Sequence, residues 1–187
     1  MRLQRMHGVA GTAFADVLAD SGAPRGSVYH HFPDGRAQLA AAATEHGADW
    51  IAGQLEQLLA AGDPLRALDG FIELWAGIVR EEQYMAGCAV AAGALDSTPG
   101  SAARRAAAAG FSRWERILTD AFAAHVPVAQ AEGLAVTCIA AVEGALILVR
   151  AEGTLRPLER VAEQLRQLLV ATQQTDPASD GTASRPR

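Results

Sequence analysis

The sequence predicts an all-α fold, and three observations support this prediction. Alanine-rich segments recur along the chain with apolar residues spaced by three and four, the period of an amphipathic helix. Glycines, prolines and capping residues separate these segments. No stretch shows the clear alternation of apolar and polar residues that a half-buried strand requires.

Two short helices are predicted near the N-terminus, separated by three residues. Thr12 is suited to cap the first helix, which runs to about Asp20, and Gly22 then ends it. Pro24 occupies the first position of the second helix, which reaches about His31. Two helices joined in this way form a helix-turn-helix.

Longer helices are predicted in the rest of the chain. A break at 33–35 precedes a helix over about 36–60, and Asp63 is suited to cap the next, over about 64–80. A short helix follows Cys88. Three further helices, opened by a turn at 96–101 and by two prolines, span about 102–125, 128–153 and 157–173.

Composition and charge limit the class of protein. Half of the 187 residues are hydrophobic and a fifth are charged, which is typical of a globular protein. Residues 1–36 have a net charge of +1, whereas the remainder has −6, in agreement with the overall −5. An anion-binding surface is therefore expected at the N-terminal end, and the remainder should repel nucleic acid.

The chain is expected to be a soluble, cytoplasmic protein. Cys88 and Cys138 stand in apolar segments far apart, as reduced, buried thiols do. The N-terminal residues lack the apolar core of a signal peptide, and the longest apolar run, GALILV, is too short to span a bilayer.

The second short helix has a face suited to DNA. If Val28 and Phe32 pack against Phe14, Val17 and Leu18 of the preceding helix, then Gly26, Tyr29 and His30 point outward, with Ser27 on one flank and Arg25 on the first turn. Arginine can bind guanine through two hydrogen bonds, Tyr and His can contact phosphates or base edges, and glycine lets the backbone approach the duplex.

Two alternatives stay open on these residues alone. The helix pair can be a hairpin that binds nothing, or the two histidines can be half of a metal site. Neighbouring histidines point about 100° apart on a helix, which disfavours shared metal binding.

The segment GTAFADVLADSGAPRGSVYHHFPDGRAQL, residues 11–39, resembles the DNA-binding segment of the TetR family of bacterial repressors. Gly-Thr, the turn glycine, Tyr29, His31, Phe32 and Arg36 fall in register with the family pattern. The expected DNA contacts are Thr12, Arg25, Gly26, Ser27, Tyr29, His30, His31 and Arg36.

The remainder resembles the regulatory domain of the YxaF/LmrA-like branch, at 87–97, 111–122 and 140–169. This resemblance implies a homodimer that binds operator DNA when empty and releases it when a small molecule fills the C-terminal domain. It also implies a helix-turn-helix domain over 1–45, with a shortened first helix, and a regulatory and dimerisation domain over 46–173. The polar tail, 174–187, is predicted to be disordered.

Aromatic and sulfur-containing side chains of the C-terminal domain are candidates for a ligand pocket, although each can be ordinary core. Glu143 is the informative exception, because a carboxylate within CIAAVEGALILV requires water, a partner charge or a polar ligand. A mostly apolar pocket with one or two polar groups suits a planar, partly polar aromatic ligand. The candidates are Phe71, Trp75, Tyr84, Met85, Cys88, Phe111, Trp114, Cys138 and Glu143.

A stripe of small residues on the helix over 128–153 allows a second helix to approach closely, from the same subunit or from a partner. The family resemblance favours a four-helix interface across a two-fold axis. The candidate interface residues are Ala140, Ala141, Gly144, Leu148, Leu165 and Leu168.

The sequence contains no catalytic triad, no cluster of metal ligands and no phosphate-binding glycine loop, so no enzyme, metal or cofactor is predicted. The predicted function is that of a homodimeric transcriptional repressor with double-stranded operator DNA and a small-molecule effector as partners. One alternative is a DNA-binding protein whose C-terminal domain only dimerises. The other is a helical small-molecule-binding protein whose N-terminal hairpin no longer binds DNA.

Overall fold

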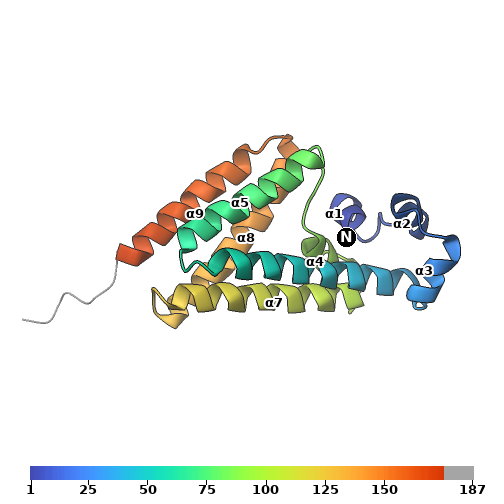
Figure 1. Ribbon diagram of the computed structural model, residues 1–187, viewed down its shortest axis with the longest axis horizontal. Helices are drawn as coiled ribbons and strands as arrows, with labels where there is room; N and C mark the ends of the chain where they lie inside the picture. The colour runs from blue at the N-terminus through green and yellow to red at the C-terminus, as the bar shows by residue number, and fades with distance from the viewer. Residues whose placement is uncertain (175–187) are drawn as a thin grey trace, which may run out of the picture.

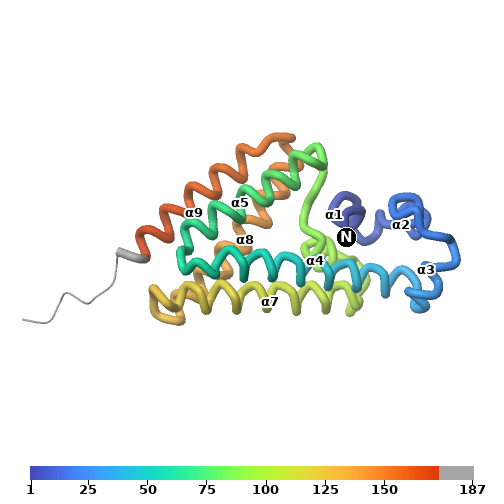
Figure 2. Tube along the Cα trace, in the orientation of Figure 1, coloured from blue at the N-terminus to red at the C-terminus, as the bar shows by residue number. Residues whose placement is uncertain are grey.

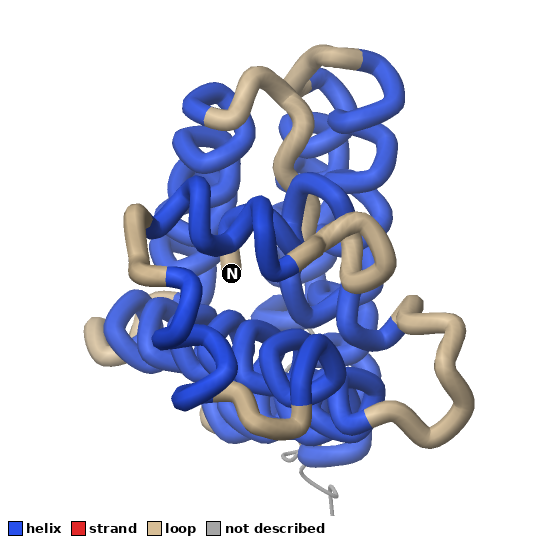
Figure 3. Tube along the Cα trace, turned by 90° about the vertical axis from the view of Figure 1, so that its right-hand side faces the viewer, coloured by secondary structure: helices blue, strands red, loops and turns tan. Residues whose placement is uncertain are grey.

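The computed structural model describes residues 1–174, which form helices and no strand (Figure 3). The all-α prediction is therefore confirmed. The predicted tail lies outside the described residues except for Gln174, which ends the last helix. The helices are α1 (Arg2–His7), α2 (Phe14–Ser21), α3 (Arg25–His31), α4 (Gly35–Leu59), α5 (Pro64–Glu81), α6 (Ala89–Ala94), α7 (Ala102–Ala123), α8 (Val128–Glu152) and α9 (Arg156–Gln174).

Polar side chains cap two of the long helices, and the cap at Asp63 is the predicted one. The Asp63 carboxylate accepts hydrogen bonds from the backbone N–H groups of Leu65 and Arg66, at 3.0 and 3.2 Å, and so caps α5. The Ser101 hydroxyl accepts from the N–H of Arg104 at 3.2 Å and caps α7. These bonds satisfy donors that a helix start otherwise leaves free.

The predicted cap at Thr12 is wrong. Ala13 is the N-cap of α2, and its backbone N–H donates to the Asp16 carboxylate at 3.3 Å. The Thr12 hydroxyl instead donates to the Gly8 carbonyl at 2.7 Å. Thr12 therefore closes the turn after α1 rather than the start of α2.

The long helices α4 and α7 lie side by side and both run away from the end formed by α1, α2 and α3 (Figure 1, Figure 2). Their backbones approach closely, because a Cβ atom added to Gly110 would lie 2.6 Å from the Cβ of Ala48. α4 is continuous across residue 45, the predicted domain boundary. One helix thus extends from the helix-turn-helix into the C-terminal domain.

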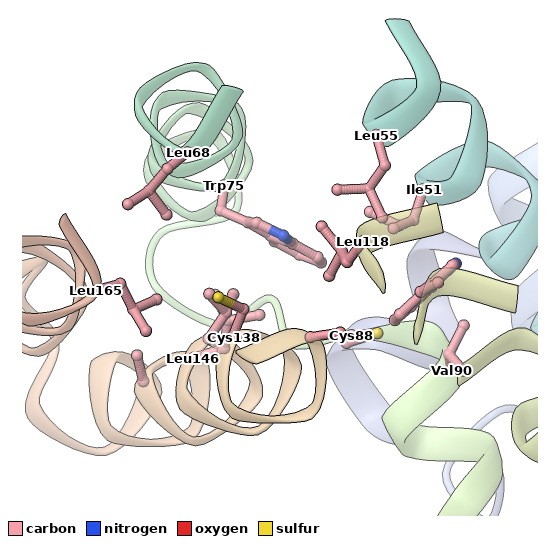
Figure 4. Close-up of a cluster of buried hydrophobic side chains, with 14 of the residues drawn as sticks. Ile51, Leu55, Leu68, Trp75, Cys88, Val90, Leu118, Cys138, Leu146 and Leu165 are labelled. Atoms are coloured by element: carbon pink, nitrogen blue, oxygen red, sulfur yellow. The ribbon is translucent and has the colours of Figure 1, made fainter. Parts of the chain in front are cut away.

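The hydrophobic core lies between α4, α5, α7, α8 and α9, and Figure 4 shows side chains from these helices meeting at its centre. Among the described residues, α8 is the helix whose length and composition would also suit a membrane span. It packs against both α7 and α9, and buried residues recur along it every three or four positions. We therefore assign α8 to the core of this fold.

A buried polar contact joins α1 to the C-terminal domain. The side chain of Gln4 is 2% exposed, and its amide Nε2 donates to the Thr44 hydroxyl of α4 at 2.8 Å and to the Ala89 carbonyl of α6 at 3.0 Å. The Gly87 N–H donates to the Arg5 carbonyl at 3.1 Å. These bonds fix the position of α1 relative to both α4 and α6.

Candidate functional site

The connection between α2 and α3 has the geometry predicted for a helix-turn-helix. Gly22 adopts the left-handed conformation (φ 66°), and its N–H donates to the Leu18 carbonyl at 3.0 Å. Pro24 then precedes the first residue of α3. Of the five apolar residues expected between the two helices, Val28 is buried, whereas Phe14, Val17, Leu18 and Phe32 are half-buried.

The outward face of α3 is exposed at the end of the molecule (Figure 1). Arg25, Gly26, His30 and His31 are exposed, and the Tyr29 side chain is 70% exposed. The ring of Tyr29 meets Phe14 edge to face at 5.9 Å, which holds it across α2. This face has the cationic and hydrogen-bonding groups that bind a DNA groove.

Three other predicted DNA contacts have partners inside the protein. The Ser27 hydroxyl donates to the Pro24 carbonyl at 2.6 Å, and the Thr12 hydroxyl is bound to Gly8. The Arg36 guanidinium donates to the carbonyls of Val9 and Ala10, at 3.3 and 3.0 Å. Arg36 thus ties the start of α4 to the turn after α1.

An apolar cavity of about 60 Å³ lies inside the C-terminal domain, between α4, α5, α7, α8 and α9; we call it cavity 1. Five predicted pocket residues line it: Phe71, Trp75, Trp114, Cys138 and Glu143. The sequence did not distinguish the aliphatic residues of its wall, because leucines at helical spacing occur in any core. Residues of this kind are Leu55, Leu59, Leu68, Leu118, Ile139, Val142 and Leu169.

Four predicted pocket residues do not line cavity 1. Phe111 is half-buried and packs its ring edge to face against Trp114 at 5.1 Å. Gln83 and Tyr84 have φ angles of 51° and 63°, and this left-handed turn after α5 leaves Met85 exposed. Cys88 is buried at the start of α6.

The two tryptophans of cavity 1 differ in their hydrogen bonds. Trp114 Nε1–H donates to the Ala48 carbonyl of α4 at 2.9 Å. The side chain of Trp75 is 2% exposed, and its Nε1–H has no hydrogen-bond partner among the described residues. A buried donor without a partner is uncommon in folded proteins.

Glu143 is the carboxylic acid among the residues that line cavity 1. Burial raises the pKa of its carboxyl to about 7, although the neighbouring Cys88 thiol lowers it slightly. Burial and the nearby Glu143 carboxylate together raise the pKa of the Cys88 thiol well above its ordinary value. Near neutral pH, Glu143 can therefore either donate a proton in a hydrogen bond or accept one.

Small and apolar residues form a row on α8 at intervals of four, in which Val136, Ala140 and Leu148 are exposed and Gly144 is half-buried. Nothing lies within 4 Å of a Cβ atom added to Gly144, so this position is open to a neighbouring helix.

The other three predicted interface residues differ in exposure. Ala141 is half-buried beside the row on α8, and Leu168 of α9 is 38% exposed. The assignment of Leu165 to an interface is wrong, because its side chain is 3% exposed and packs in the core of its own subunit.

No group of three or more His, Cys, Asp or Glu side chains that could bind a metal occurs in residues 1–172.

Comparison with known proteins gives matches over most of the chain. Residues 64–164 match the family model described as "Transcriptional regulator LmrA/YxaF-like, C-terminal domain". The helix-turn-helix transcriptional regulator Rv0196 of Mycobacterium tuberculosis is 36% identical over 176 residues, which cover 90% of this chain and 89% of that protein. The regulator YxaF of Bacillus subtilis is 27% identical over 178 residues, 90% of both chains.

Solved structures share the fold. A TetR transcriptional regulator from Legionella pneumophila superposes with a TM-score of 0.79 at 22% identity, covering 89% of this chain and 90% of that one. The regulatory protein TetR from Rhodobacter sphaeroides gives a TM-score of 0.76 at 21% identity, with 88% and 93% covered.

Proposed function

Because this chain belongs to the TetR family of transcriptional regulators, in its LmrA/YxaF-like branch, we propose that it is a cytoplasmic repressor and not an enzyme. In this proposal the protein binds operator DNA as a homodimer and releases the DNA when a small aromatic ligand binds. One observation supports this function above the others. α4 begins beside the helix-turn-helix, where Arg36 binds the turn after α1, and its other end lines cavity 1 through Leu55 and Leu59. A single rigid helix therefore connects the two surfaces.

Cavity 1 is smaller than a ligand with two aromatic rings, so such a ligand fits when the walls move apart. Leu55 and Leu59 belong to these walls, and expansion of the cavity therefore displaces α4. The ligand then binds the expanded form better than the form that fits the operator. A coupling free energy of about 1 to 3 kcal/mol would weaken operator binding roughly 5- to 150-fold.

The DNA surface is tested by Arg25→Ala. Arg25 is exposed on the first turn of α3, where an arginine can bind a guanine through two hydrogen bonds. The substitution is expected to weaken specific operator binding by about 1 to 3 kcal/mol and to relax the base preference at one position of each half-site. Fluorescence anisotropy with operator variants and with random DNA measures both effects.

Arg116→Ala is the matched control, since Arg116 is an exposed arginine of α7 whose guanidinium binds the Ser112 carbonyl of its own helix. It should leave operator affinity unchanged. Equal weakening of operator and random DNA by Arg25→Ala would show that Arg25 contacts only the phosphate backbone. Absence of operator binding by the unmodified protein would favour a small-molecule-binding protein instead.

The ligand cavity is tested by Trp75→Phe with 2-naphthol as the probe. The Nε1–H of Trp75 can donate to the naphthol oxygen, while the hydroxyl can donate to Glu143. Loss of the Trp75 donor should cost about 0.5 to 1.5 kcal/mol of binding free energy in calorimetry, and should not reduce operator binding by the empty protein.

Trp114→Phe is the volume-matched control. It removes the same ring volume but also the bond to the Ala48 carbonyl, so it should lower the free energy of unfolding by about 1 kcal/mol more than Trp75→Phe. If both variants bind 2-naphthol as the unmodified protein does, the ligand site is not cavity 1.

The homodimer is proposed from the row of small and apolar residues on α8. Val136, Ala140, Gly144 and Leu148 form a face without bulky polar groups, and Leu168 of α9 adds to its apolar area. Small residues at intervals of four allow two helices to pack closely across a two-fold axis. Analytical ultracentrifugation should give twice the 19.5 kDa mass of the chain, whereas a monomer at micromolar concentration would contradict the dimer.

A further inference from the structure

A second cavity, of about 310 Å³, lies where α1 joins the C-terminal domain; we call it cavity 2. Its walls come from α1 and the turn after it, from the loop before α6, from α6 with the residues after it, and from α8. It is larger than cavity 1, and Glu143 borders both. Of the predicted pocket residues, Cys88 and Glu143 line it.

Two arginines line cavity 2, and neither is fully paired. The side chain of Arg5 is 12% exposed, and its buried Nε–H has no hydrogen-bond partner among the described residues. Its nearest carboxylate, Glu82, lies 3.7 Å away and is shared with Arg2 at 3.5 Å. Burial outweighs this contact and lowers the pKa of Arg5, which indicates that its positive charge is incompletely compensated.

Arg150 is the second arginine. In the described part of the chain its guanidinium contacts no carboxylate within 4 Å, and its hydrogen bond goes to the Arg5 carbonyl at 3.5 Å. This bond places the Arg150 guanidinium next to the backbone of Arg5. The two arginines belong to the lining of cavity 2 from different helices, α1 and α8.

The acidic groups of cavity 2 compensate this charge only in part. The pKa of Glu143 is about 7, so its carboxyl is mostly neutral at about pH 6. The Asp96 carboxylate accepts a hydrogen bond from the N–H of Thr98 at 3.2 Å, and its hydrogen bond with Ser101 lowers its pKa. Both partners of this carboxylate therefore lie in the turn before α7. His7 adds a third basic group to the lining.

The rest of the lining is apolar. Leu146 and Ile147 of α8 form one side, and Ala91, Ala92 and Leu95 form another. A cavity with two arginines and apolar walls suits a ligand that has an acid group and a hydrophobic part, because arginine binds carboxylates through two parallel hydrogen bonds.

We propose that cavity 2 is a second ligand site, specific for a small organic anion whose acid group pairs with Arg5 and Arg150 and whose apolar part lies against Leu146 and Ile147. Such a ligand connects α1 directly to α8. Its binding therefore changes the orientation of the helix-turn-helix, and with it operator affinity. This regulatory effect rests on the proposed function, whereas binding of the anion does not.

The test uses isothermal titration calorimetry at about pH 6 with 1-naphthoate as the anion and 1-naphthamide as its neutral counterpart. The protein should bind 1-naphthoate at least about tenfold more tightly than the amide. Arg150→Gln and Arg5→Gln should each abolish this preference, with folding checked by circular dichroism. Arg150 is exposed on α8, so its substitution leaves the core intact.

Two controls separate cavity 2 from cavity 1 and from general charge effects. Arg116→Gln removes an exposed arginine of α7 and should leave 1-naphthoate affinity unchanged. Trp75→Phe, in cavity 1, should also leave it unchanged.

Three results would overturn the proposal: equal affinity for acid and amide, loss of 1-naphthoate binding in Trp75→Phe but not in Arg150→Gln, or no binding of 1-naphthoate, benzoate or octanoate up to about 10 mM. Operator binding by the empty protein is measured in parallel. It tests the proposed function independently, since an empty cavity 2 leaves the α3 surface unchanged.

Discussion

Gly110→Ala is expected to lower the free energy of unfolding by about 1 to 3 kcal/mol, although alanine is the better helix former. The added Cβ would lie 2.6 Å from the Cβ of Ala48, which is fixed to the backbone of α4 and cannot rotate away. The two long helices must therefore separate. Urea denaturation followed by circular dichroism measures the change.

Gly53→Ala is the matched control. Gly53 lies in the interior of α4, with nothing within 4 Å of an added Cβ, so the same substitution there should stabilise the protein by about 0.5 to 1 kcal/mol. Opposite signs at the two positions are the expected result. Stabilisation by both substitutions would mean that α4 and α7 can separate at little cost.

Glu143→Gln is expected to raise the free energy of unfolding at pH 8 by about 1 to 3 kcal/mol. The pKa of Glu143 is raised from 4.5 to about 7 in the folded protein, so the unfolded chain loses this proton first as the pH rises. The carboxylate therefore destabilises the folded state progressively between pH 4.5 and about 7, and the full penalty remains above that range. Glutamine has no proton to lose, and the variant avoids the penalty.

Denaturation measured from about pH 4 to pH 8 tests this prediction, because the gain from Glu143→Gln should disappear at the acid end. Glu45→Gln, at an exposed position of α4, is the control and should show no comparable dependence on pH. A gain that is constant across the range would assign the effect to packing. A loss of stability at pH 8 would show that the carboxylate is paired in solution.

Local chemistry explains why the helix boundaries could be predicted. Asp63 and Ser101 bind the first free N–H groups of their own helices, and Gly153 ends α8 in the left-handed conformation. Interactions of this kind depend only on neighbouring residues. Glu143 could also be singled out from sequence, because a carboxylate in an apolar segment is uncommon.

Long-range packing explains what the sequence could not predict. Arg36 meets carbonyls 26 and 27 residues earlier, a contact that no local pattern indicates. Leu165 and Leu168 are both leucines of the same amphipathic helix, yet the first is 3% exposed and the second 38% exposed. Which face of α9 meets its own subunit depends on the positions of α5 and α8, and these follow from the whole fold.

The contact of Gln4 with α4 and α6 determines how the DNA-binding end can move. Rotation of α1 away from α6 would break both hydrogen bonds of the Gln4 amide, at a cost of about 1 to 3 kcal/mol if the amide stayed buried without a partner. Hydrogen bonds weaken steeply as the donor–hydrogen–acceptor angle departs from linear, so a small rotation of α1 would weaken the bonds of Gln4 without forming new ones. We therefore expect α1 to adopt two distinct orientations rather than a continuous range of them. In hydrogen exchange the Gly87 amide, which is bound to the Arg5 carbonyl, should therefore become exposed in a single cooperative opening with the bonds of Gln4.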